Sequence, residues 1–189
     1  MMGVERIPAS ALPPSDSKPD YVHRMSRREP LPFEIRASPI EGFGAFATEA
    51  IAAGVRLIEY AGERLSPAEA DARYPDIAGA RHHTCLFAID DEIVIDAAVN
   101  GNEARFINHS CAPNCDAVIE GGRIWIETIH DIEPGEELAY DYAYVLEERH
   151  TPVAKRRFPC HCGAATCRGT ILARKRKVAR LSRRRGAPR

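Results

Sequence analysis

The sequence predicts a mainly β fold built from short strands. Runs of apolar and β-branched residues recur along the 189 residues, and clusters of Gly, Pro, Asp and Asn separate them. Two pairs of runs lie on either side of tight turns and therefore predict β-hairpins. These pairs are residues 84–89 with 93–96, around Asp90-Asp91-Glu92, and residues 117–120 with 123–129, around Gly121-Gly122. Regular alternation with such short turns is ordinarily typical of a sandwich or a barrel.

The first strand is expected at residues 33–37. Phe33-Glu-Ile-Arg-Ala alternates between apolar and polar side chains, and Ser38-Pro39 ends the pattern. Residues 1–31 contain five prolines and no apolar period, so they cannot bury enough surface to offset the entropy of ordering. We therefore expect a disordered arm over residues 1–31 and a folded domain from residue 32.

One short helix is expected after a buried strand at residues 54–60. Ser66 is a good N-cap, Pro67 suits the first helical position, and Glu69 completes a capping box. The helix should run to Arg73, since Pro75 cannot continue it.

Composition indicates one globular domain without a membrane span. The chain is 44% hydrophobic and 28% charged, and it has no basic start followed by an apolar run. Nowhere do about 18 consecutive apolar residues occur, so we expect a protein that is neither secreted nor membrane-bound.

Charge is distributed unevenly along the chain. Residues 174–189 carry nine Lys or Arg and no acid, so residues 1–173 carry 17 basic and 27 acidic side chains. The basic tail, residues 173–189, is interpreted either as a solvated end or as a contact for nucleic acid.

Three of the six cysteines, Cys160, Cys162 and Cys167, form a C-x-C-x4-C cluster in a polar, basic stretch. Six cysteines could form three disulfides, but the absence of a secretion signal favours a reducing compartment, where metal binding is the better interpretation. Thiolates in this spacing favour Zn²⁺, which takes four protein ligands in most structural sites.

Gly42-Phe-Gly44 follows the first strand and is a candidate ligand-binding turn. Glycines permit a close approach of the backbone to a ligand, but a lone G-x-G is equally typical of a tight turn between strands. Both interpretations stay open at this point. No G-x-G-x-x-G follows a strand, so nothing indicates a Rossmann-type nucleotide site.

Two polar motifs are the strongest functional signals: Arg105-Phe-Ile-Asn-His-Ser-Cys-Ala-Pro-Asn-Cys115 and Gly135-Glu-Glu-Leu-Ala-Tyr-Asp-Tyr142. The first has the composition of a site-bearing loop, and the second puts two phenols two residues apart on one side of an extended segment. Together with the G-x-G and the cysteine cluster, in this order, they resemble the SET-domain protein lysine methyltransferases with a zinc-binding post-SET segment. The resemblance covers residues 32–172, and the small size is similar to that of bacterial SET proteins.

The resemblance implies a fold of short curled sheets, in which the two motif segments are threaded in a pseudoknot-like arrangement. It implies a SET domain over residues 32–145 and a zinc-stapled post-SET segment over residues 146–172. It also implies S-adenosyl-L-methionine as cofactor, Zn²⁺ as structural metal, and methyl transfer to lysine.

The resemblance assigns roles to residues by their positions in the motifs. Tyr142 matches the catalytic phenol, and Tyr140 matches a second catalytic position, where Tyr or Phe influences the number of methyl groups added. Cys111 matches the fourth metal ligand beside the cysteine cluster, which leaves Cys115 free. The cofactor-binding positions are Glu41, Gly42, Phe43, Gly44, Asn108, His109 and His161.

Two positions depart from the family pattern. Cys85 stands where many relatives carry a tyrosine, so one pocket phenol is missing, and Cys85 joins Tyr140 as an expected product-specificity residue. Glu41 precedes the G-x-G where relatives often carry another polar residue.

The expected function is therefore methylation of lysine in a basic, histone-like protein, because an acidic body attracts basic peptides. The expected location is a bacterial cytoplasm, or an association with a nucleoid or chromatin. Two alternatives stay open: a zinc-stapled module that binds nucleic acid through its basic tail, and a SET fold that has lost activity. Binding of S-adenosyl-L-methionine separates the enzyme from the nucleic-acid-binding module.

Overall fold

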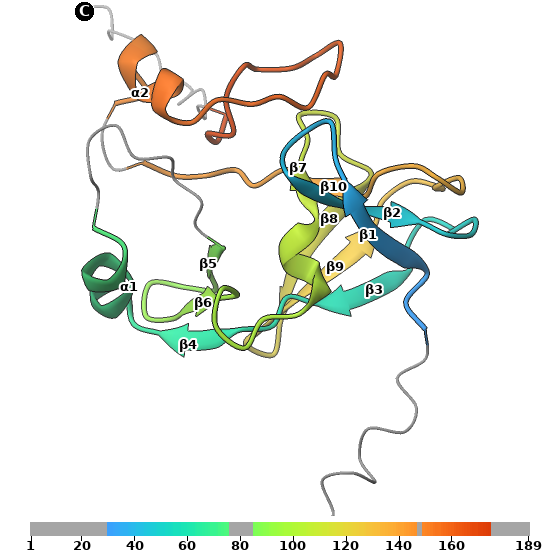
Figure 1. Cartoon of the computed structure of the whole chain (residues 1–189). Coiled ribbons are helices and arrows are strands. Elements are labelled where there is room, and N and C mark those ends of the chain that lie inside the picture. Colours follow the sequence, from blue (N-terminus) through green and yellow to red (C-terminus); the bar gives the residue numbers. More distant parts are fainter. Residues whose placement is uncertain (1–29, 76–84, 147–148, 175–189) are drawn as a thin grey trace, which may run out of the picture. The chain divides into compact units, whose positions relative to one another are not determined.

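The computed structural model describes residues 30–75, 85–146 and 149–174. The described residues from Leu31 onward belong to one compact unit. The elements, in chain order, are β1 (Phe33–Ala37), β2 (Phe43–Ala47), β3 (Arg56–Glu59), β4 (Glu63–Leu65), α1 (Pro67–Arg73), β5 (Leu86–Ala88), β6 (Val94–Asp96), the 3-10 helix η2 (Glu103–Phe106), β7 (Asn108–His109), β8 (Cys115–Glu120), β9 (Arg123–Thr128), β10 (Ala139–Tyr140) and α2 (Pro152–Arg157) (Figure 1).

The strands form four small sheets. Their strand orders are β1-β2, β3-β9-β8, β4-β6-β5 and β10-β7. The prediction of a mainly β fold of short sheets is therefore confirmed. The expected strand at 33–37 coincides with β1, whereas the strand expected at 54–60 is shorter, because only Arg56–Glu59 pairs with β9.

Both predicted hairpins are present. β5 pairs antiparallel with β6, from Leu86 opposite Asp96 to Ala88 opposite Val94. β8 pairs antiparallel with β9 up to Glu120 opposite Arg123. The two glycines between Glu120 and Arg123 have φ of 57° and 69°, as a type I′ turn requires.

The predicted capping box begins helix α1. The Ser66 side chain accepts the Glu69 N–H, and the Glu69 carboxylate accepts the Ser66 N–H at 2.8 Å. Burial alone would raise the pKa of Asp96 on β6, but hydrogen bonds from Arg73 (2.7 Å) and Tyr74 (2.9 Å) lower it. The end of α1 is therefore fixed to β6 by a charge-assisted contact.

The main core lies under β1, β2, β9 and the two motif segments. Along β9, buried Ile124, Ile126 and Thr128 alternate with more exposed residues, as the period of a strand requires. Ile107, Ile132 and Leu138 come from the motif segments or beside them and are also fully buried. Each such aliphatic side chain contributes about 1.5–3 kcal/mol by burial.

The two motif segments lie side by side in the smallest sheet. β7 and β10 pair in parallel, with Asn108 opposite Ala139 and His109 opposite Tyr140 (Figure 1). The Ser110 N–H donates to the Tyr140 carbonyl at 3.1 Å and extends this contact. Two segments with 29 residues between His109 and Ala139 are thereby brought together, and the pseudoknot-like threading itself stays a prediction.

The described residues after β10 form little regular structure. Thr151 caps α2 by accepting the Ala154 N–H, and isolated bridges join Tyr144 to Leu172 and Pro159 to Thr170.

Several expectations fall partly or wholly outside the described residues. These are the arm at 1–29, Thr84 and the tail at 175–189, and the domain boundaries stay predictions. In the part of the chain that the structure describes, no helix combines the length and apolar character needed to cross a membrane.

Candidate active site and metal centre

A cavity of about 970 Å³ lies between the motif segments, the β5–β6 hairpin and the segment after β10. Ten predicted site residues line this cavity: Glu41, Gly42, Phe43, Cys85, Asn108, His109, Tyr140, Tyr142, Cys160 and His161. Gly44 lies in β2 instead, where an added Cβ would collide with the Glu137 side chain. A side chain at position 44 would therefore displace the Glu137 carboxylate, which is bonded to Ser38 and Asn108.

Asn108 ties the G-x-G loop to β7. Its amide nitrogen lies within hydrogen-bonding distance of the Glu137 carboxylate (2.7 Å), the Phe43 carbonyl (3.0 Å) and the Ser38 hydroxyl (3.1 Å). The Ser38 hydroxyl donates to the same Glu137 carboxylate at 2.7 Å. Gly42 has φ of 45°, which suits glycine, and Phe43 is exposed. The contacts of Asn108 therefore fix the loop, whose backbone faces the cavity.

Tyr140 and Tyr142 face the cavity from β10 and the residues after it. Their ring centroids are 4.8 Å apart, and the Tyr142 hydroxyl donates to the Ile107 carbonyl at 3.0 Å. Burial raises the pKa of both phenols, so both stay protonated at neutral pH. The Tyr140 hydroxyl, on a side chain only 5% exposed, has no hydrogen bond to another described residue.

His109 lies between Tyr142 and the cysteine cluster. Its Nδ1 accepts the Tyr142 N–H at 3.1 Å, and its Nε2 lies 3.4 Å from Cys111 Sγ. Burial lowers the pKa of His109 to about 4, so the imidazole is neutral at pH 7. Because Nδ1 is an acceptor here, the proton of the neutral ring lies on Nε2 and points at the sulfur.

The sulfur of Cys111 lies beside the sulfurs of the three-cysteine cluster, the arrangement that the resemblance implied. The sulfurs of Cys111, Cys160, Cys162 and Cys167 all lie within 4.8 Å of one another. Cys160 Sγ is 3.7 Å from both Cys111 Sγ and Cys167 Sγ, too far for a disulfide. Four sulfurs about 2.3 Å from a central zinc would be about 3.8 Å apart, so the donor set fits this metal.

Backbone N–H groups surround the sulfurs. Arg168 N donates to Cys111 Sγ at 3.3 Å, and Gly169 N donates to Cys167 Sγ at 3.4 Å. Burial favours the neutral thiol of Cys162, but N–H donors from Cys111 and Ala164 and the adjacent thiols lower its pKa to about 6. Such donors stabilise thiolates, the form in which cysteine binds a metal.

Cys115, expected to be free, lies outside this cluster. It is 1% exposed, and burial raises its pKa to about 12. It therefore behaves as a small apolar side chain of the core.

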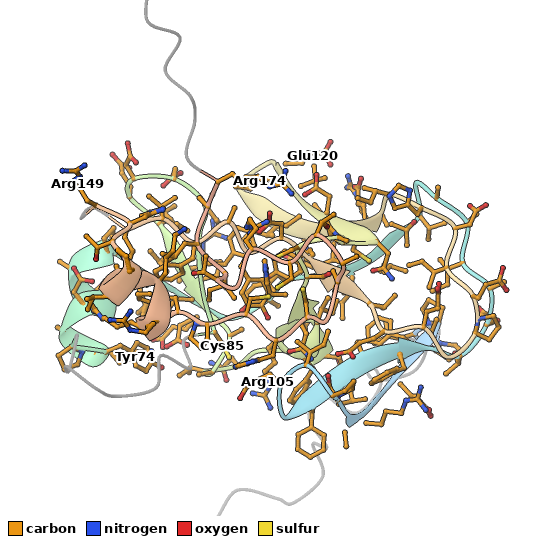
Figure 2. All side chains as sticks on the ribbon, turned by 90° about the horizontal axis from the view of Figure 1, so that it is seen from above. Tyr74, Cys85, Arg105, Glu120, Arg149 and Arg174 are labelled. Atoms are coloured by element: carbon orange, nitrogen blue, oxygen red, sulfur yellow. The ribbon has the colours of Figure 1, made fainter. Side chains whose placement is uncertain are left out.

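Cys85 has a polar neighbour that sequence reasoning missed. The Tyr60 hydroxyl donates to the Cys85 carbonyl at 2.9 Å, and the Tyr60 ring packs against Phe87 at 5.5 Å between centroids. Arg105 from η2 also lines the cavity near Cys85 (Figure 2). Tyr60 ends the run at residues 54–60 that predicted a buried strand, and Tyr60-Ala-Gly-Glu63 resembles a segment of the SET family, so both were signals that could have identified it.

Ser38, Glu137, Asp141 and Arg168 also went unnoticed as site residues. Ser38 and Glu137 fix Asn108, and Arg168 forms an ion pair with Asp141 between the two tyrosines. Asp141 and Glu137 lie inside the second motif, but only the folded chain shows which partners they have.

A mainly β chain with a parallel β7–β10 pair, a tyrosine-lined cavity and a four-cysteine centre defines a recognisable class. Residues 42–143 match the SET domain family, so the chain belongs to the SET-domain family.

Relatives with similar sequences include plant and fungal proteins. The histone-lysine N-methyltransferase TRX1 of Oryza sativa is 43% identical over 142 residues, which is 71% of this chain and 13% of that protein. The H3 lysine-4 specific histone-lysine N-methyltransferases of Saccharomyces cerevisiae and Schizosaccharomyces pombe are 40% and 44% identical over 77% and 71% of this chain. The chain spans only 13–14% of the length of these three relatives.

Proposed function

We propose that this protein transfers methyl groups from S-adenosyl-L-methionine to the ε-amine of lysine in a basic protein. The observation that carries the proposal is the pair of buried phenols in the cavity, Tyr140 and Tyr142, at the junction of β7 and β10. Membership of the SET-domain family and the names of its relatives support the same chemistry.

S-adenosyl-L-methionine would supply an electrophilic methyl group whose bond to sulfur breaks as the lysine nitrogen bonds to the carbon, so that positive charge passes from sulfur to nitrogen. The residues that would hold it are the loop Glu41–Gly44, with Asn108, His109 and His161. Gly44 would contribute indirectly, since it lies against the Glu137 side chain and does not line the cavity.

The lysine must lose its proton to water before it reacts. A free lysine has a pKa of about 10.4, so only about one side chain in a few thousand is neutral at pH 7. Burial in a cavity disfavours the charged ammonium and lowers this pKa, so no strong base is needed.

Tyr142 is the proposed catalytic phenol. Its proton is donated to the Ile107 carbonyl, so its lone pairs remain available for the amine or the polarised methyl group. Tyr140, whose hydroxyl has no hydrogen bond to another described residue, lines the same cavity and is the second proposed catalytic residue. A protonated phenol does not compete with the amine as a nucleophile.

Tyr140 and Cys85 are the proposed product-specificity residues. Phe87 stacks on Tyr140 at 6.1 Å between centroids and lies two residues after Cys85, and both Phe87 and Cys85 line the cavity. The volume left by the missing ring at Cys85 would therefore adjoin the Tyr140 hydroxyl, where a methylated amine needs room.

Zn²⁺ is the proposed metal, and its proposed ligands are Cys111, Cys160, Cys162 and Cys167. The sulfur separations and the surrounding N–H donors support this assignment. The metal would hold Cys160 and His161 at the cavity wall, next to the proposed cofactor site.

A histone or histone-like protein is the proposed substrate. The excess of acid over base in residues 1–173 attracts a basic chain, and relatives are named for histone H3 lysine 4. We accordingly propose an association with chromatin or a nucleoid. A bacterial origin stays a prediction.

The test is incubation with labelled S-adenosyl-L-methionine and a panel of basic proteins that includes purified core histones. Label located on lysine by mass spectrometry is the expected result. A thermal shift with the unlabelled cofactor measures binding separately. Binding without any labelled lysine would favour the SET fold that has lost activity.

A second candidate is nucleic-acid binding through the basic end of the chain. Residues 149–189 contain 14 Lys or Arg and no acidic residue. Within the described part of this stretch, the side chains of four exposed cations make no ion pair or hydrogen bond with another described residue: Arg149, Lys155, Arg156 and Arg174. Two of them, Arg149 and Arg174, are labelled in Figure 2. In the β-strand region, by contrast, Arg56, Arg73 and Arg123 are each paired with carboxylates.

Salt dependence distinguishes this candidate. Phosphate contacts make affinity for duplex DNA fall steeply with salt, and Lys155→Ala with Arg156→Ala should reduce the slope by about two. An unchanged affinity would mean that these side chains are only solvated. Nucleic-acid binding without any binding of S-adenosyl-L-methionine would favour the non-catalytic module.

A further inference from the structure

Arg168 and Asp141 form a two-pronged ion pair that the proposed chemistry does not use directly. Arg168 Nη1 donates to Asp141 Oδ2 at 2.8 Å, and Nη2 donates to Oδ1 at 2.7 Å. The Arg168 side chain is 14% exposed and that of Asp141 is 31% exposed. Two parallel charge-assisted bonds fix the relative orientation of the two planar groups, which one bond would not do.

The two ends of this pair are attached to different parts of the site. Arg168 follows Cys167 in the chain, and its N–H donates to Cys111 Sγ at 3.3 Å. Its backbone is therefore fixed by two members of the sulfur cluster.

Asp141 lies between Tyr140 and Tyr142, and its Oδ1 accepts the Ala143 N–H at 3.0 Å. Ala143 has φ of 44°, a left-handed conformation that costs a non-glycine residue about 1–2 kcal/mol. The carboxylate therefore stabilises a strained turn directly after Tyr142.

We propose that Arg168 is a positioning residue: through Asp141, it couples occupancy of the four-sulfur centre to the orientation of Tyr142. The inference rests on the proposed metal site and on the proposed methyl transfer. Metal binding would draw the four sulfurs into one fixed arrangement, which would fix the backbone of Arg168. The fork of Arg168 would then hold the Asp141 carboxylate, and with it the turn that sets the Tyr142 ring in the cavity.

The coupling must act in both directions. If an occupied centre favours the Arg168–Asp141 pair, then an intact pair favours binding of the metal by the same factor. Asp141 makes no contact with a cysteine sulfur among the described hydrogen bonds. Its substitution should nevertheless weaken metal binding, and a purely local role in the turn would not do this.

The experiment is a double-mutant cycle with Arg168→Gln, Asp141→Asn and the double variant. Zinc affinity is measured by competition with a chromophoric chelator, and kcat and KM are measured with a basic peptide. We expect each single variant to bind zinc about tenfold more weakly and to lose about tenfold in kcat, as outer-shell substitutions typically do. The double variant should lose little more than either single one.

Two further variants make the result specific. Arg123→Gln breaks an exposed ion pair with Glu59 on β9 and β3, and it should change neither zinc affinity nor kcat. Arg168→Lys keeps the charge and loses the fork, so its losses should be of the same kind as those of Arg168→Gln. It also replaces Arg168→Gln in the cycle if that variant does not fold.

Unchanged zinc affinity in Asp141→Asn, or losses that add in the double variant, would overturn the proposal. The zinc measurement does not depend on activity. If the wild type proves to transfer no methyl group, the proposed function fails, while the linkage between Asp141 and the metal is still decided by the chelator competition.

Discussion

Compared with the region from β1 to β10, the described part of the region from Tyr144 to Ala173 has fewer paired strands and fewer buried apolar side chains. The first region has paired strands and buried aliphatic side chains such as Ile107, Ile126 and Leu138. In the described part of the second, the buried apolar side chains are those of Ala154, Phe158 and Leu172. Both regions nevertheless contribute residues to the same cavity.

One cavity wall therefore rests on a hydrophobic core, whereas the other would depend on the proposed metal at its four-sulfur centre. A segment of this size with so few buried apolar groups needs a metal or a covalent link in order to stay ordered. The Tyr144 and Ala173 backbones bond to each other (2.8 Å) across the ends of this segment. Removing the metal should therefore disorder the wall formed by residues 144–173 and leave the wall formed by β1 to β10 intact.

The largest expected effect is that of Cys160→Ser. Loss of one ligand opens a closed tetrahedral site, so zinc content should fall to a small fraction of the wild-type value, and cofactor affinity should fall with it. Hydrogen exchange should become fast at the amides of Arg168, Gly169 and Ala173 and stay slow on β8 and β9. Metal analysis and exchange measured by mass spectrometry check both parts.

Cys115→Ser is the matched control for this experiment. Its buried hydroxyl should cost about 1–3 kcal/mol of global stability. It should leave the zinc content unchanged, because Cys115 lies in the core and outside the sulfur cluster. If Cys160→Ser accelerated exchange equally in both regions, the two walls would be one cooperative unit and the comparison would be wrong.

Tyr142→Phe addresses the chemistry, and it also removes the hydrogen bond from the Tyr142 hydroxyl to the Ile107 carbonyl. The ring keeps its packing against Tyr140, but the oxygen that would meet the reacting group is gone. We expect kcat to fall about 10²–10³-fold while S-adenosyl-L-methionine affinity stays within about threefold, since the lost interaction belongs to the transition state. Steady-state kinetics and calorimetric titration measure the two quantities.

Tyr74→Phe is the control for a lost phenol. Tyr74 donates to Asp96 outside the cavity, so this variant should lose some stability and keep its activity. Near-normal turnover of correctly folded Tyr142→Phe would contradict the proposed mechanism.

The sequence was sufficient where a signal is local. Ser66 and Glu69 make a capping box from residues three apart, and Gly121-Gly122 makes a turn that needs positive φ at both positions. Such features depend on backbone sterics and on hydrogen bonds between residues close in the sequence, so a short segment is enough to predict them.

The sequence was insufficient where the site depends on pairing between residues far apart in the chain. A two-residue parallel pair between β7 and β10 has no periodicity to detect. The contacts of Asn108 with Ser38 and of Arg168 with Asp141 join residues 70 and 27 positions apart. The motif residues could be named from resemblance, but the partners that orient them follow only from the fold.

A smaller effect is expected from ending the chain at Ala173. The last described backbone bond of the segment, from Ala173 N to the Tyr144 carbonyl, would remain. Activity on a short peptide should therefore stay within about twofold, while affinity for DNA should fall because nine cations are lost. Peptide kinetics and DNA titration at two salt concentrations check this. Loss of peptide activity by the folded truncation would mean that the tail supports the second wall.

The smallest and most specific effect concerns Cys85, which lies in the first wall. Cys85 is partly buried, and the Tyr60 hydroxyl holds its carbonyl, so the backbone at this position is fixed whatever side chain it carries. A tyrosine here would extend from a fixed point toward the space beside Tyr140. The added ring should fill volume that a methylated amine would otherwise occupy.

We therefore expect Cys85→Tyr to shift the products toward monomethyl-lysine, by about two- to fivefold in the ratio of mono- to higher methylation, which corresponds to about 0.4–1 kcal/mol. Product ratios at matched turnover, measured by mass spectrometry, give this number. Overpacking can cost about 1–3 kcal/mol of stability, so thermal unfolding must be compared first. Cys85→Ser is the control, since it changes polarity with little change in volume and should leave the ratio unchanged. If the wild type already makes only monomethyl-lysine and the folded Cys85→Tyr variant is slower, then Cys85 is a fitted part of the pocket, and the space attributed to a missing phenol is already filled by its neighbours.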